Sequence, residues 1–148
     1  MTTNTPIIIE HLFKATAENV WNALTSVDEM RKWYFNVNDF KPILNFEFQF
    51  VGQGSKGEKY IHLCKITEII PVKKLQYSWK YENYPGSSML TFELTAQDNS
   101  TLVKLIHEGL DSFPTDNPDF AKESFSLGWK KIITDSLQNY LEKKRATY

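Results

Sequence analysis

The chain has 148 residues, which fits a single domain over 1–148, and its ten Phe, seven Tyr and four Trp can form a core or line a pocket. Its formal net charge is −1, with positive and negative side chains interspersed along the sequence. Such a distribution gives no electrostatic footprint for nucleic acid or for an anionic membrane, so we expect neither partner.

The first part of the chain predicts one strand followed by two short helices. The β-branched run from Ile7 to Phe13 is typical of a strand. Thr16 can then cap a helix, whose buried face would hold Ala17, Val20, Trp21 and Leu24. The spacing from Ser26 to Glu29 is that of a capping box and predicts a second short helix, with Met30, Trp33 and Tyr34 on one side.

The middle of the chain predicts consecutive antiparallel strands, because apolar and polar residues alternate at period two. The alternating runs are 46–50, 59–70, 75–79, 90–94 and 103–107, and turn-rich segments separate them. In the long run 59–70, one parity holds Tyr60, His62, Cys64 and Ile66, and the other holds Ile61, Leu63 and Ile69. This strand is therefore either buried on both faces or bulged near its middle.

The C-terminal part predicts one long helix that begins at Asn117 and Pro118 and ends at about Lys143. At 1.5 Å per residue it would run about 39 Å. Its broad apolar arc must lie across the antiparallel sheet, and holds Ala121, Phe125, Trp129, Ile132, Ile133 and Tyr140. Gly128 lies at the border of this arc, where glycine costs about 1 kcal/mol relative to alanine, so a packing or functional reason is expected.

This order of elements resembles a known family, and several stretches carry the resemblance: ATAENVWNALTSVDEMRKWY, KITEIIPVKKLQYSW, STLVKLIHEGL and FSLGWKKIITDSLQNYL. The sequence is similar to the family named after the activator of the heat-shock-protein-90 ATPase. That family belongs to the START-like, birch-pollen-allergen-like (SRPBCC) superfamily. The resemblance implies an α+β helix-grip fold, in which a curved antiparallel six-stranded sheet wraps around the long C-terminal helix. The sequence departs from the common pattern at Asn45, where members often carry glycine, and at Phe125, where tryptophan is common.

The resemblance implies no single activity, because the superfamily includes lipid and hormone binders, polyketide cyclases and ATPase activators that act through surface contacts. We expect binding of a small apolar or amphipathic molecule in a cavity between sheet and helix, without covalent catalysis or a cofactor. Two alternatives stay open: a chaperone ATPase activator that acts by surface contact, and a small cyclase- or dehydratase-like enzyme. The oligomeric state is left open.

Candidate ligand-binding residues are the aromatic and polar side chains that can face such a cavity. They are Trp33, Phe48, Phe50, His62, Cys64, Tyr77, Trp79, Phe92, His107, Phe125 and Trp129. The aromatic members could instead fill the core, in which case Gly128 would permit tight packing of helix on sheet rather than open a hollow. For His62 and His107 the alternatives are a place in the cavity or a hydrogen-bonded structural role. No arrangement of acid and base is legible, so no catalytic residue is assigned.

Two local features have competing interpretations. Residues 52–57, GQGSKG, match G-x-G-x-x-G, but a dinucleotide fingerprint opens a helix, whereas the alternating EKYIHLCKIT follows here, so we expect a hairpin loop. The irregular segment 109–120 is either an entrance loop to the cavity or an ordinary connector.

The remaining expectations concern metal, redox state and location. The three histidines lie in no metal-binding motif, so no metal site is expected. Cys64 is the single cysteine, which excludes an intrachain disulfide, and within a strand it should be poorly accessible and non-catalytic. No run of about 18 apolar residues exists, so no membrane insertion is expected. The start MTTNTP lacks the features of a signal peptide, and a cytoplasmic location is expected.

Overall fold

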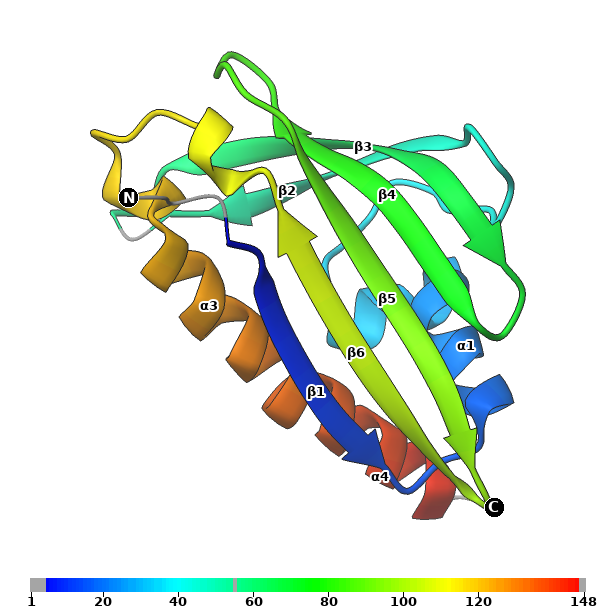
Figure 1. The fold of residues 1–148 in the computed structure, drawn as a ribbon. Coiled ribbons are helices and arrows are strands. Elements are labelled where there is room, and N and C mark those ends of the chain that lie inside the picture. The colour runs from blue at the N-terminus through cyan, green and yellow to red at the C-terminus, as the bar shows by residue number, and fades with distance from the viewer. Residues whose placement is uncertain (1–4, 55, 147–148) are drawn as a thin grey trace.

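The elements of the computed structural model, which describes residues 5–54 and 56–146, follow the predicted order (Figure 1). Strand β1 (Ile7–Phe13) is followed by helices α1 (Ala17–Thr25) and α2 (Val27–Trp33). The next strands are β2 (Glu47–Gln53), β3 (Lys59–Ile70), β4 (Lys74–Tyr81), β5 (Ser88–Gln97) and β6 (Ser100–Glu108). Two 3-10 turns, η1 (Leu110–Ser112) and η2 (Pro118–Phe120), lead into the C-terminal helix. That helix comprises α3 (Lys122–Lys131), a π-helical segment η3 (Ile132–Leu137) and α4 (Gln138–Ala146).

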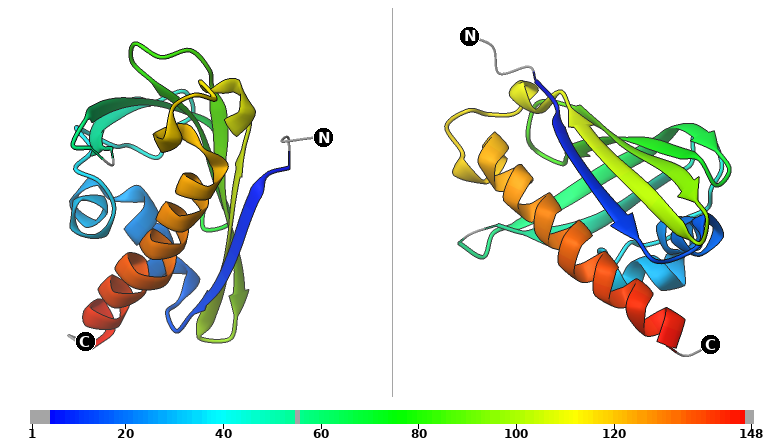
Figure 2. Two further views of the ribbon diagram at one scale, coloured as in Figure 1. Left: turned by 90° about the vertical axis from the view of Figure 1, so that its left-hand side faces the viewer. Right: turned by 60° about the horizontal axis from the view of Figure 1, so that its bottom comes forward.

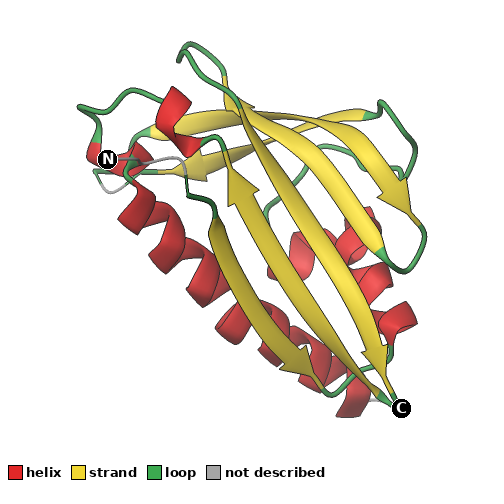
Figure 3. Ribbon diagram, in the orientation of Figure 1, coloured by secondary structure: helices red, strands yellow, loops and turns green. Residues whose placement is uncertain are grey.

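The six strands form one antiparallel sheet in the order β1-β6-β5-β4-β3-β2. The sheet is strongly curved, and the long C-terminal helix runs across one side of it (Figure 2). Helices α1 and α2 lie on that same side, so that all the longer helices cover one face (Figure 3). This arrangement confirms the α+β helix-grip fold with a six-stranded curved sheet.

Strand β3 is bulged rather than buried on both faces. Its pairing with β4 shifts register between Ile66 and Glu68. Before the bulge His62 and Cys64 are buried while Ile61 and Leu63 are only partly covered. The extra residue reverses the parity, so Ile69 pairs with the buried Leu75 and packs against the core.

The C-terminal helix keeps one row of side chains on the sheet over its whole length. The buried residues of this row are spaced by four: Phe125, Trp129, Ile133, Leu137 and Leu141. In an α-helix such a row drifts by about 40° per step, because 3.6 residues make a turn. The wider π segment turns less per residue, so it brings the row back toward the sheet.

One predicted cap and one predicted helix start need correction, although α2 does begin directly after Ser26. The capping box at Ser26 does not form, because Glu29 instead accepts hydrogen bonds from Tyr140 Oη (2.7 Å) and Lys144 Nζ (2.8 Å) of the C-terminal helix. The long helix begins at Lys122 and not at Pro118, since Pro118–Phe120 forms a separate 3-10 turn. Thr16 caps α1 as predicted, by accepting the Asn19 N–H (3.2 Å).

Asn45 has a backbone conformation that glycine, the residue expected here from the resemblance, would also adopt. Its φ is 71°, which lies in the left-handed region. Glycine adopts this region without strain and asparagine tolerates it better than most residues. The departure from the common pattern therefore preserves the backbone conformation that leads into β2.

Candidate ligand-binding pocket

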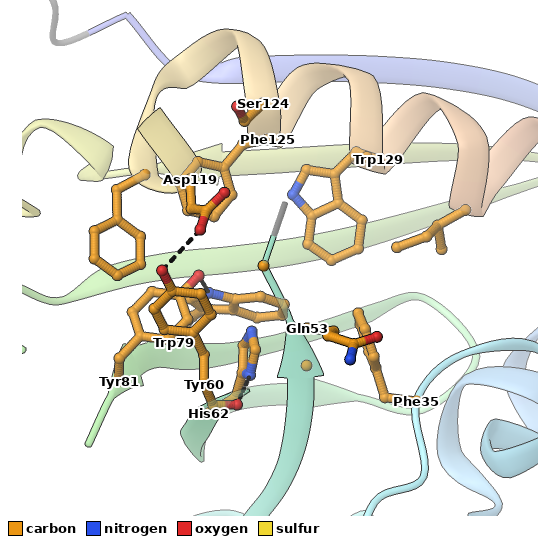
Figure 4. A pocket seen from close by; sticks show the side chains of 15 residues that line it. Phe35, Gln53, Tyr60, His62, Trp79, Tyr81, Asp119, Ser124, Phe125 and Trp129 are labelled. Atoms are coloured by element: carbon orange, nitrogen blue, oxygen red, sulfur yellow. Dashed lines mark hydrogen bonds between the residues drawn. The ribbon is translucent and has the colours of Figure 1, made fainter. Parts of the chain in front are cut away.

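A pocket of about 240 Å³ lies between the sheet and the first turns of the C-terminal helix (Figure 4). Aromatic side chains form most of its wall: Phe35, Tyr60, His62, Trp79, Tyr81, Phe120, Phe125 and Trp129. The remaining lining residues come from the β2–β3 hairpin and the C-terminal segment: Gly52, Gln53, Gly54, Asp119, Ser124, Gly128 and Ile132. Gln53, Ser124 and Gly128 are exposed, which places the mouth between the hairpin and α3.

Gly128 opens onto this pocket. A Cβ atom built on it would have no heavy atom of a neighbouring segment within 4 Å. The space beneath this turn of α3 is therefore not filled by tight contact between helix and sheet. Of the two reasons expected for this glycine, the structure supports the open space.

The two glycines at the start of the GQGSKG segment allow close approach of pocket side chains to the backbone. A Cβ on Gly52 would lie 2.5 Å from Cε1 of His62. A Cβ on Gly54 would overlap the Asp119 carboxylate and lie 2.7 Å from Cε2 of Tyr60. The segment joins two antiparallel strands and opens no helix, which confirms the hairpin.

His62 lies in the wall of the pocket as a neutral imidazole. Its Nδ1–H donates to the Tyr60 carbonyl oxygen (3.1 Å), so Nε2 carries the lone pair and can only accept. The ring stacks on Phe50, with centroids 4.4 Å apart. Burial lowers the pKa of His62 to about 4, since charging the ring would cost its hydration. The residue therefore both lines the pocket and makes a structural hydrogen bond.

His107 has a structural role beneath the pocket. Trp129 Nε1–H donates to its Nδ1 (2.9 Å), so Nε2 carries the proton and donates to Ser88 Oγ (2.8 Å). Ser88 in turn donates to the Trp79 carbonyl oxygen (2.9 Å). His107 is fully buried, and burial lowers its pKa to about 3. This chain holds the indole of Trp129 in one orientation against the sheet.

One end of the pocket holds a polar group built from two distant segments. Tyr60 Oη–H of β3 donates to Asp119 Oδ2 (2.7 Å), as Figure 4 shows, and Asn117 Nδ2 donates to the same hydroxyl (3.2 Å). The Asp119 N–H donates to Asn117 Oδ1 (2.9 Å). These bonds anchor the end of segment 109–120 at the pocket, where Asp119 and Phe120 join the lining.

The structure brings four of the sequence-predicted residues together in the lining: His62, Trp79, Phe125 and Trp129. The other predicted residues are buried outside this lining: Trp33, Phe48, Phe50, Cys64, Tyr77, Phe92 and His107. Trp33 Nε1–H donates to the Ala23 carbonyl oxygen (2.8 Å). The hydroxyl groups of Tyr77 and Tyr34 are hydrogen-bonded to each other (2.8 Å). Burial raises the pKa of the Cys64 thiol, which keeps it protonated.

Several lining residues were not predicted as ligand-binding. Tyr60 shares strand parity with His62, and Tyr81 shares it with Trp79, so parity alone could have found both. Phe35 and Asp119 come from irregular segments, whose sequences carry no periodic signal. Their place in the lining depends on the tertiary structure.

Two larger depressions differ in character from this pocket. One, of about 410 Å³, has Phe48 and Cys64 on its border but is lined mainly by polar and charged residues such as Glu47, Lys65 and Lys80. The other, of about 530 Å³, lies around Glu108 and Asp111. Neither has the aromatic wall that a site for an apolar molecule needs.

Two further features are absent from the described residues. No group of three or more His, Cys, Asp or Glu side chains there could hold a metal ion. In the same residues, no helix is both long and apolar enough to span a membrane.

Comparison with known proteins places the chain in a family. The family described as Activator of Hsp90 ATPase homolog 1-like protein matches residues 14–142. Protein MLL2253 from Mesorhizobium loti is similar in structure, with 22% identity, a TM-score of 0.74 and coverage of 93% of this chain and 97% of that chain. Protein CV1439 from Chromobacterium violaceum has 18% identity and a TM-score of 0.79, and the match covers 93% of this chain and 97% of that chain.

CalU16 from Micromonospora echinospora has 20% identity and a TM-score of 0.70, and the match covers 96% of this chain and 79% of that chain. At these identities the structural likeness shows the fold alone. No curated protein matches the chain. The chain belongs to the family of Activator of Hsp90 ATPase homolog 1-like proteins.

Proposed function

We propose that this protein binds a small apolar or amphipathic molecule in the pocket beneath α3. The observation that carries the proposal is a concave pocket with a mostly aromatic wall. Gly128 borders this pocket and has no side chain that would fill it. Ligand sites are typically apolar hollows with a few polar groups that orient the ligand. Here those groups are Nε2 of His62, the Gln53 amide and the pair Tyr60–Asp119.

The size of the pocket limits the ligand. Its volume of about 240 Å³ lies just below the range of about 300–1,000 Å³ that is typical of ligand pockets. A compact molecule therefore suits this space, whereas a long acyl chain would have to extend through the mouth. The ligand we expect is therefore compact, and its apolar body would contact Trp79 and Trp129.

The chemistry of the wall favours binding over turnover. His62 has a pKa of about 4, so at neutral pH its ring is neutral, and Nε2 can accept a hydrogen bond but is a weak base. The Cys64 thiol lies outside the lining and its pKa is raised by burial, so it is a poor nucleophile. Conversion of a bound molecule would instead indicate the enzyme alternative.

Native mass spectrometry of freshly purified protein tests the proposal. We expect a small retained molecule on the wild type and on Gly128→Ala, and its loss from Gly128→Leu, whose side chain would enter the pocket. A retained molecule that stays bound to Gly128→Leu would place the site elsewhere and contradict the proposal.

A second function, activation of a chaperone ATPase by surface contact, is favoured by family membership and by two exposed apolar side chains on β1. Ile8 and Leu12 are 54% and 49% exposed, and they pair with Ile106 and Leu102 of β6. A concentration-dependent rise in the ATPase rate of a cognate chaperone, lost in an Ile8→Ser, Leu12→Ser variant but kept in Gly128→Leu, would support this function. An unchanged ATPase rate would exclude it for that chaperone.

A further inference from the structure

The described lining of the pocket contains one charged side chain, and that side chain is acidic. Of the described residues in the lining, Asp119 is the one acidic residue, and no Lys or Arg is among them. His62 adds no positive charge at neutral pH, because burial lowers its pKa to about 4. Among these lining residues, a bound carboxylate or phosphate would therefore lie near the Asp119 carboxylate, which would repel it.

The Asp119 carboxylate is held at the pocket by the fold. Its Oδ2 accepts the hydrogen of Tyr60 Oη (2.7 Å), and the missing side chain of Gly54 leaves room for it against the hairpin. A second carboxylate, that of Glu58, lies nearby: its Oε1 is 2.9 Å from the position that a Cβ on Gly54 would take. Desolvation raises the pKa of Tyr60, and the charges of Asp119 and Glu58 raise it further.

Aromatic rings face this negative end of the pocket. Tyr60 and Phe120 lie 5.3 Å apart between ring centroids, and Tyr81 lies 4.8 Å from Phe120. Trp79 and Trp129 extend the wall, with centroids 5.3 Å apart. The faces of such rings attract cations, and the attraction is strongest where water is excluded.

We propose that the pocket selects a compact organic cation, an ammonium group carried on an aromatic or aliphatic body, over neutral and anionic molecules of the same size. This inference rests on the proposed ligand-binding function and adds the charge of the ligand. The ammonium group would lie between the Asp119 carboxylate and the aromatic faces, and the apolar body would lie beneath Gly128.

Three probes of matched size separate charge from shape: phenyltrimethylammonium, its neutral isostere tert-butylbenzene, and phenylacetate. Affinities for the full chain are measured by isothermal titration calorimetry. We expect phenyltrimethylammonium to bind at least about tenfold tighter than tert-butylbenzene, as a cation between aromatic faces and a carboxylate should. Phenylacetate should bind most weakly.

Two variants locate the effect. Asp119→Asn keeps the shape and removes the charge, and should reduce the preference for the cation to about two- to threefold, the part due to the rings. Gly128→Leu should weaken binding of all the probes together. If Asp119→Asn does not fold, the ratio of the wild-type affinities for phenyltrimethylammonium and tert-butylbenzene by itself tests the cation selectivity.

The outcomes are distinct. Equal affinity for phenyltrimethylammonium and tert-butylbenzene, or tighter binding of phenylacetate, overturns the cation selectivity and leaves the binding function standing. A tenfold preference that survives in Asp119→Asn also overturns it, because the charge would then come from elsewhere. Binding of none of the probes overturns both the selectivity and the proposed pocket.

Discussion

Replacing Gly128 by leucine tests whether α3 covers a hollow or a filled core. The position lies inside a helix, where glycine costs about 1 kcal/mol relative to a good helix former. Since a Cβ there would meet nothing within 4 Å, the larger side chain should enter without overpacking. Full burial of a leucine side chain stabilises a folded protein by about 1.5–3 kcal/mol. Because Gly128 is exposed, a leucine there would gain only part of this energy.

The expected result is a rise of about 1–2 kcal/mol in the free energy of unfolding, with a fall of at least about tenfold in ligand affinity. Urea denaturation at equilibrium measures the first quantity and calorimetric titration of a bound probe the second. Gly128→Ala is the matched control, because it gains the helix propensity of about 1 kcal/mol but leaves the pocket open. Loss of about 1–3 kcal/mol in Gly128→Leu would refute the hollow and establish overpacking of a tight contact.

Further predictions concern the core, the thiol and the two buried imidazoles. Trp21 is 8% exposed in the core, so Trp21→Ala should lower the free energy of unfolding by about 3–5 kcal/mol; an unchanged denaturation midpoint would show that α1 docks by other contacts. Cys64 is buried, so a thiol reagent should label it slowly in the native protein and fast in denaturant, and rapid native labelling would argue against a closed sheet at β3. The pKa values of about 4 for His62 and about 3 for His107 lie below the usual 6.5. As the pH falls below about 6.5, the unfolded chain therefore binds protons at these rings before the folded protein does. The stability that the two neutral rings contribute is complete above about pH 6.5 and is lost as the pH falls toward their folded-state pKa values. By pH 5 each should have lowered the free energy of unfolding by about 2 kcal/mol, and equal stability at pH 7.5 and 5 in urea titrations would contradict this linkage.

The order of the helices and strands could largely be predicted from the local pattern of apolar and polar residues. Period-two alternation predicted the strands, and the broad apolar arc from Ala121 to Tyr140 predicted which face of the long helix contacts the sheet. The conflict of parity in residues 59–70 predicted either burial on both faces or a bulge near the middle, and the structure shows the bulge between Ile66 and Glu68. These features follow from the sequence because each depends on which face of one element must be buried, and that is set by neighbours along the chain.

The tertiary structure alone decided which aromatic side chains surround the pocket and which fill the core. Phe92 and Trp79 both alternate inward on neighbouring strands, but only Trp79 is part of the pocket lining. Tyr60 and Asp119 are 59 residues apart and meet because the hairpin and the turn η2 are folded against each other. No periodicity encodes such a meeting, since it depends on how far the sheet curves and where the helix begins. The charge and size of the pocket therefore become visible only when the distant segments are packed together.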